Sequence, residues 1–348
     1  MTNERIRVGI TLGDMNGVGP EIILKTVSDN RLAQDLTIIV YGSNRVLNFY
    51  KKELDIEQFS FHGIKDATDA IPKKVNLVSL TKQELPVSPG EVTEIAGKLA
   101  FMSLEAAVKD LAGNKIDVLI TSPINKKNIQ QKGFDFPGHT EYLAKYSNVD
   151  QALMLMCSES LRVGVVTAHI PLKEVSEKIT KSQIVAKLVA MDKSLKMDFT
   201  IQKPSIAVLG LNPHAGDNGL LGMEEKEVII PALAEAKEEG VFAFGPYPAD
   251  GFFAGDSFKK FDAILAMYHD QGLIPFKSIA GDYGVNYTAG LPIVRTSPAH
   301  GTAYDIAGKG IANEQSFRQA IYMACDIYRN RTENRQLAAN ALEVSKKD

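Results

Sequence analysis

The sequence predicts an α/β fold with a largely parallel sheet that helices cover on both faces. The first observation is that short apolar runs alternate along the chain with segments of helical periodicity, which is typical of parallel sheets with helical crossovers. The second is the length of 348 residues, which favours two domains or one large α/β unit. The third is composition, because 45% hydrophobic and 23% charged residues are ordinary for a globular protein with a large core.

The first half of the chain opens on a strand and a helix. A run of β-branched residues at 7–12 ends at Gly13, and Pro20 stands where a helix begins, a position that proline favours. The alanine-rich segment 92–111 repeats its apolar residues with a helical period, so it predicts a long helix. Further strands are predicted at 36–41, 75–80 and 116–120.

The second half continues the same alternation. Strands are predicted at 152–157, 162–167, 205–211, 263–267 and 286–288, and helices at 182–195, 223–239 and 316–330. The first two of these strands are joined by a turn at Glu159 and Ser160, so we expect them to be adjacent.

Charge and cysteine content exclude several classes of protein. The net charge of −3 and the pI near 6.1 lack the basic surplus of a nucleic-acid binder, so we expect no nucleic-acid partner. Cys157 and Cys325 form no Cys-x-x-Cys pair, which argues against a zinc ribbon and suits a reducing cytoplasm. No apolar run reaches the length of a signal-peptide core or a membrane span, so we expect a cytoplasmic protein with no membrane partner.

The common nucleotide-binding motifs are absent. The glycines between Gly13 and Pro20 are spaced wrongly for the G-x-G-x-x-G fingerprint, and neither a P-loop nor an H-E-x-x-H sequence occurs. If a nicotinamide cofactor is used, it has to bind in a manner different from that of the Rossmann fold.

Three of the six histidines come within three residues of the end of a predicted strand: His169, His214 and His269. Ligands of open α/β sheets bind at the carboxyl ends of strands, and three imidazoles with an open fourth position hold catalytic zinc or a similar ion. Asp270 is placed to orient one ligand ring. Taken singly, each of these histidines is more typical of a loop or capping residue, whereas three at equivalent strand ends favour a metal site. We expect His300 to be structural.

A second group of polar residues suits an anion. Thr140 can cap the helix that follows His139, and a helix start offers N–H groups to an anion. Lys277, Asn286 and Arg295 are residue types that clamp a phosphate or a carboxylate. A simple helix cap and unrelated surface groups stay open as the alternative.

Several short strings in a fixed order run through nearly the whole chain. They are Thr11-Leu12-Gly13-Asp14, Gly17-Val18-Gly19-Pro20-Glu21, Thr121-Ser122-Pro123-Ile124-Asn125-Lys126, Gly138-His139-Thr140-Glu141, Leu211-Asn212-Pro213-His214-Ala215-Gly216, Tyr268-His269-Asp270-Gln271-Gly272, Gly290-Leu291-Pro292 and His300-Gly301-Thr302-Ala303. Together they resemble the 4-hydroxythreonine-4-phosphate dehydrogenase family of pyridoxal phosphate biosynthesis. One departure, Asp14-Met15-Asn16, replaces a proline and a small residue found in many members; it lies outside the predicted site.

The resemblance implies a fold like that of isocitrate and isopropylmalate dehydrogenases, with two α/β/α domains and a central cleft. One domain would comprise 1–130 plus 302–348, and the other, 131–301, would carry most of the metal and substrate residues. The resemblance also implies NAD or NADP as cofactor and a homodimer with the active site at its interface. The family's metal ligands, for zinc, magnesium or cobalt, match His169, His214 and His269, and its substrate contacts match His139, Thr140, Lys277, Asn286 and Arg295.

The implied reaction is the metal-dependent oxidation of 4-phosphooxy-L-threonine, with decarboxylation to 3-amino-2-oxopropyl phosphate. Lys277 and Asp250 are both candidates for the general base. A dehydrogenase of a phosphorylated sugar acid, 4-phospho-threonate or 4-phospho-erythronate, would carry the same histidines. An acyltransferase of related fold and a non-catalytic sensor of a phosphorylated ligand are the more distant alternatives.

Overall fold

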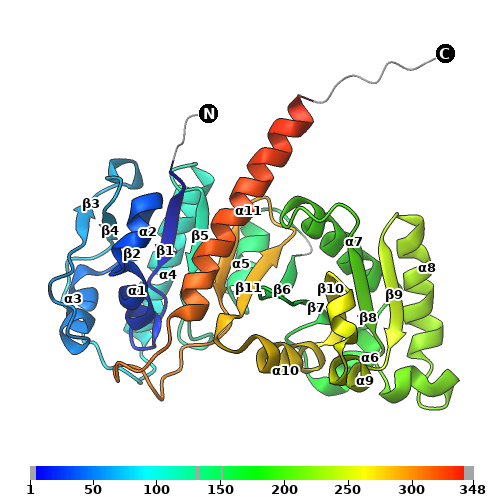
Figure 1. Ribbon diagram of the computed structural model, residues 1–348. Helices are drawn as coiled ribbons and strands as arrows, with labels where there is room; N and C mark the ends of the chain where they lie inside the picture. The colour runs from blue at the N-terminus through cyan, green and yellow to red at the C-terminus, as the bar shows by residue number, and fades with distance from the viewer. Residues whose placement is uncertain (1–4, 131–133, 150–151, 341–348) are drawn as a thin grey trace.

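The computed structural model of the protein describes residues 5–130, 134–149 and 152–340. Within these ranges, twelve strands form one sheet in the order β3-β4-β2-β1-β5-β12-β11-β6-β7-β10-β8-β9 (Figure 1). The strands are β1 Arg7–Thr11, β2 Thr37–Gly42, β3 His62–Ile64, β4 Val75–Ser79, β5 Val118–Thr121, β6 Leu153–Cys157, β7 Arg162–Thr167, β8 Ser205–Leu209, β9 Phe242–Tyr247, β10 Ala263–Tyr268, β11 Val285–Ala289 and β12 Arg295–Pro298.

The sheet is parallel towards both ends and antiparallel in the middle. One end of the sheet is a parallel group made of β3, β4, β2, β1, β5 and β12, and the other end is a parallel group made of β7, β10, β8 and β9. Between these groups, β11 is antiparallel to β12 and β6, and β6 is antiparallel to β7. The prediction of a largely parallel sheet is confirmed, although it did not include the antiparallel centre.

Three strands, β3, β9 and β12, were not predicted. β9 is an edge strand in which Phe242 and Phe244 are exposed and Pro246 interrupts the run, so it lacks the buried apolar pattern that marks the other strands. β3 and β12 are only three and four residues long, too short for a periodic signal.

Both faces of the sheet are buried. In β2, Ile38 and Val40 belong to one apolar cluster, whereas Ile39 and Tyr41 belong to another, as the alternating geometry of a strand requires. The helices are α1 Gly19–Val27, α2 Asn30–Asp35, α3 Asn44–Glu53, α4 Glu94–Ala112, α5 His139–Tyr146, α6 Val175–Lys178, α7 Lys181–Met197, α8 Ile230–Glu238, α9 Ala249–Ala254, α10 His269–Ala280 and α11 Gln315–Ala339. Side chains of α1 and α11 enter the first cluster, and α4 contributes to both, mainly to the second.

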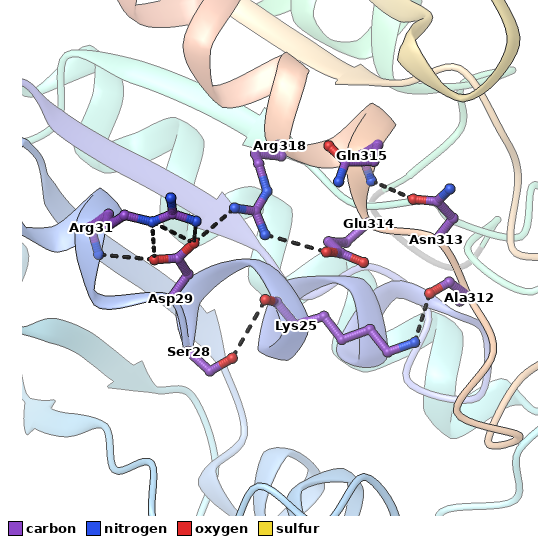
Figure 2. A network of polar contacts seen from close by, with 9 residues as sticks. All are labelled: Lys25, Ser28, Asp29, Arg31, Ala312, Asn313, Glu314, Gln315 and Arg318. Atoms are coloured by element: carbon purple, nitrogen blue, oxygen red, sulfur yellow. Dashed lines mark hydrogen bonds and ion pairs between the residues drawn. The ribbon is translucent and has the colours of Figure 1, made fainter.

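A polar network fastens the start of α11 to the N-terminal helices (Figure 2). Arg318 contacts Asp29 at 3.0 Å, and Asp29 also holds Arg31 at 2.6 Å. The Lys25 ammonium donates to the carbonyl of Ala312 at 2.7 Å. These contacts join the two ends of the chain, while the full division into 1–130 plus 302–348 and 131–301 stays a prediction.

Across the described ranges, every helix is too short or too polar to cross a lipid bilayer. Cys157 and Cys325 are both buried as free thiols, and burial raises the pKa of each thiol to about 12. The two cysteines therefore pack as small apolar side chains.

Candidate active site

A pocket of about 290 Å³ brings together residues that lie far apart in the sequence. Its wall comes from the end of β5, the start of α5, the loop after β7, the helix α10 and the central strands β11 and β12. Seven of the nine predicted site residues line it, namely His139, Thr140, His169, His269, Lys277, Asn286 and Arg295. His214 and Asp250 do not.

The order of the strands brings two of the predicted metal ligands together. β10 lies between β7 and β8 and is parallel to both, so the carboxyl ends of the three strands share one edge. His169 follows β7, and His269 is the first residue of α10, directly after β10. Their ring centres are 6.0 Å apart.

His214 follows β8 on the same edge but is exposed and lies outside the pocket. It belongs to a segment, Pro213–Gly219, in which residues 214–218 all have the left-handed backbone conformation. Such strain in non-glycine residues concentrates at functional sites. Within the described part of the chain, no three histidine, cysteine, aspartate or glutamate side chains lie close enough together to hold a metal ion.

The two pocket histidines are nevertheless oriented as metal ligands usually are. Asp270 Oδ1 lies 2.7 Å from Nδ1 of His269, and Glu141 Oε1 lies 3.8 Å from Nδ1 of His169. A carboxylate hydrogen-bonded to Nδ1, as Asp270 is, favours the tautomer in which Nε2 carries the free lone pair. The donor chemistry therefore fits zinc or another ion that accepts imidazole ligands.

Arg295 is a buried cation at the wall of the pocket. The residue is 2% exposed, and among the described residues its guanidinium donates to the hydroxyls of Thr121 and Thr288, at 2.6–2.9 Å. No carboxylate of the described residues lies within ion-pair distance of it. Burial lowers the pKa of Arg295 to about 10, and the charge of Glu141 opposes this effect. A buried charge without a counter-ion at a pocket wall indicates an anionic ligand.

Four buried polar atoms of the pocket have no hydrogen-bond partner in the described part of the chain. They are Ser122 Oγ, His139 Nε2, Asn286 Oδ1 and His300 Nε2. Burial, followed by the charges of Arg295 and Lys126, lowers the pKa of His139 well below 6.5, so this imidazole is neutral. Buried polar groups are normally paired, so four unpaired polar atoms in one pocket indicate a polar ligand.

Several pocket residues, among them His300, Lys126 and Glu141, were not predicted as functional. His300, expected to be structural, lines the pocket. Lys126 also lines it, and its Nζ lies 3.3 Å from Nε2 of His169. The sequence signal for Lys126 was its position five residues after β5, at the carboxyl end of a central strand. Asp250 is exposed on α9, outside this pocket.

The comparisons with known proteins show the family. The profile of the family described as "Pyridoxal phosphate biosynthetic protein PdxA" matches residues 34–324, and the chain belongs to this family. A 4-hydroxythreonine-4-phosphate dehydrogenase of Bacteroides thetaiotaomicron is 51% identical over 343 residues, covering 98% of this chain and 94% of that protein. A protein of Oceanobacillus iheyensis, named as a candidate D-threonate 4-phosphate dehydrogenase, is 40% identical over 323 residues, covering 92% and 97%.

Solved structures agree with these relationships. The crystal structure of a 4-hydroxythreonine-4-phosphate dehydrogenase from Klebsiella pneumoniae superposes with a TM-score of 0.80 at 34% identity, covering 94% of this chain and 99% of that one. An isocitrate dehydrogenase from Methylococcus capsulatus shares the fold, with a TM-score of 0.50 at 14% identity, covering 96% and 89%. The predicted fold class is confirmed, and the chain is an enzyme of the dehydrogenase class.

Proposed function

We propose that the chain oxidises 4-phosphooxy-L-threonine with NAD or NADP as the acceptor, in pyridoxal phosphate biosynthesis. The C3 hydroxyl loses its proton, and the C3 hydride passes to the nicotinamide. The resulting β-keto acid then loses its carboxyl group as CO₂, and C2 takes up a proton to give 3-amino-2-oxopropyl phosphate. Family membership and the names of the relatives support this substrate.

The observation that carries the proposal is the buried Arg295 at the pocket wall, a cation with no carboxylate partner among the described residues. A substrate with a phosphate and a carboxylate supplies the negative charge that would pair with this guanidinium. The neutral imidazole of His139 and the hydroxyl of Thr140 add hydrogen bonds for the anionic oxygens. Asn286 faces the same pocket with its Oδ1 free to accept from a substrate donor.

His169, His214 and His269 are the proposed ligands of a divalent ion: zinc, magnesium or cobalt. When bound, such an ion supplies a Lewis acid that stabilises negative charge beside it. Glu141 and Asp270 hold the Nδ1 atoms of the two pocket histidines. Lys277 lines the pocket and Asp250 does not, so we favour Lys277 as the general base that accepts the hydroxyl proton.

We further propose a cytoplasmic homodimer whose active site is completed across the interface. The support is that His214 stands outside its own chain's pocket, in a strained segment followed by the exposed side chains Leu220, Leu221 and Met223. Exposed apolar side chains in a group are typical of protein interfaces. A second copy would cover them and bring the third imidazole to the pair.

The second candidate is the oxidation of a phosphorylated sugar acid. The relative at 40% identity named for D-threonate 4-phosphate favours it, and such a substrate carries the same two anionic groups. It differs by a hydroxyl in place of the amino group at C2. An acyltransferase shares only the fold: a phosphotransacetylase from Staphylococcus aureus superposes with a TM-score of 0.52 at 12% identity, covering 92% of this chain and 94% of that one.

The test is NADH or NADPH formation on 4-phosphooxy-L-threonine beside 4-phospho-threonate, each with and without a chelator. Chelator-sensitive turnover of the first substrate alone supports the proposal. Turnover of the second alone assigns the chain to the sugar-acid reaction, and turnover of neither refutes both. For variants of the pocket lysines, Lys127→Met serves as the matched control, because Lys127 is exposed and does not line the pocket.

A further inference from the structure

Lys126 occupies a position at the metal-ligand pair that the proposed reaction does not explain. The turn that carries it is held by Asn125, whose Oδ1 accepts from the backbone N–H of Lys127 at 2.9 Å. A Cβ at Gly138 would lie 3.3 Å from Glu141 Oε2 and 3.7 Å from Lys126 Cε. The Lys126 and Glu141 side chains therefore converge over this glycine, beside His169.

The chemistry of the contact fixes which atom accepts. A lysine ammonium has three donors and no acceptor, so in the 3.3 Å contact Lys126 Nζ donates to Nε2 of His169. The proton of the ring then lies on Nδ1, on the side of Glu141 Oε1. A metal ion needs the same Nε2 lone pair. The ammonium and the metal ion therefore exclude each other at this atom.

We propose that Lys126 couples metal binding to substrate binding by competing with the metal for His169 Nε2. This inference rests on the proposed function. The Lys126 side chain is exposed and unbranched, and it shares its pocket with Arg295 and Lys277. An anion bound there attracts the ammonium away from His169 and frees the lone pair. Metal and anionic substrate consequently favour each other, and by linkage each raises the affinity for the other by the same factor.

The first experiment titrates the metal-stripped full chain with Co²⁺ alone, followed by calorimetry and by the visible absorption of the bound ion. Lys126→Met should bind Co²⁺ about five-fold more tightly than the unaltered chain, which corresponds to one net hydrogen bond of about 1 kcal/mol. Lys126→Arg, which keeps a donor and the charge, should return the affinity towards the original value. Lys127→Met should leave it unchanged.

The second experiment repeats the Co²⁺ titration with sodium sulfate replacing sodium chloride at equal ionic strength. Sulfate should raise the Co²⁺ affinity of the unaltered chain and of Lys127→Met, but not that of Lys126→Met. Equal Co²⁺ affinity in the unaltered chain and Lys126→Met would overturn the inference and leave the proposed function standing. If Lys127→Met binds Co²⁺ as tightly as Lys126→Met in the titration without sulfate, the inference is also overturned, because the effect of removing Lys126 would then be one of net charge. An unaltered chain that binds no Co²⁺ contradicts the metal-dependent function as well.

Discussion

Replacing Arg295 by methionine should stabilise the fold and remove most of the activity. The guanidinium is 2% exposed, is surrounded by the hydroxyls of Thr121 and Thr288, and has no carboxylate partner among the described residues. Burial of an unpaired charge opposes folding. The same charge is what the anionic substrate requires, so stability and function should change in opposite directions.

The structure sets the magnitude of both effects. Burial lowers the pKa of Arg295 from its usual value to about 10, a difference that corresponds to about 3 kcal/mol. Removing the guanidinium leaves the Thr121 and Thr288 hydroxyls without their donor, at about 1 kcal/mol each. Arg295→Met should therefore raise the free energy of unfolding by about 1 kcal/mol. Loss of a charge-assisted contact of about 3 kcal/mol to the substrate should lower kcat/KM about 100-fold.

The assay pairs urea unfolding with steady-state rates of NADH or NADPH formation. Arg318→Met is the matched control, because Arg318 is paired with Asp29 and Glu314 and does not line the pocket. This variant should have lower stability and unchanged kcat/KM. If Arg295→Met is less stable than the unaltered chain by more than about 2 kcal/mol, the reasoning about its unpaired charge is wrong. Unchanged kcat/KM would refute its contact with the substrate.

Three further predictions concern other parts of the molecule. Because the pKa of His139 is lowered in the folded state, only the unfolded chain takes up a proton at this imidazole below about pH 6.5. The free energy of unfolding in urea should therefore fall less between about pH 7.5 and about pH 5.5 in His139→Gln than in the unaltered chain. Equal falls in the two proteins would contradict a neutral buried imidazole. His214→Ala should abolish metal binding measured by elemental analysis while the circular dichroism spectrum stays unchanged; full metal content in this variant would rule out His214 as a ligand. Asp29→Asn weakens the contacts with Arg31 and Arg318 and should lower the free energy of unfolding by about 1 kcal/mol, with no change in kcat/KM.

Local pattern accounts for the parts of the fold that were predicted correctly. The strands β1, β2, β7 and β10 consist mainly of apolar residues that are buried, and α4 begins where Thr93 caps the backbone N–H of Ala96. Such signals depend on side chains a few residues apart, so they can be read without the tertiary structure. The short strand β12 carries Arg295 but has no pattern of its own, because it is formed by pairing with β5 and β11.

The sequence by itself determined the α/β class, the family and the residue types of the site, since alternation, capping and ordered motifs are properties of neighbouring residues. Only the tertiary structure decided which of those residues meet. It joined His169 to His269 through the order of β7 and β10 and left His214 outside the pocket. It also placed Lys126, in the turn after β5, against His169, which lies more than forty residues further along the chain. The physical reason is that such contacts depend on sheet order and strand direction, which are set by the packing of the whole chain.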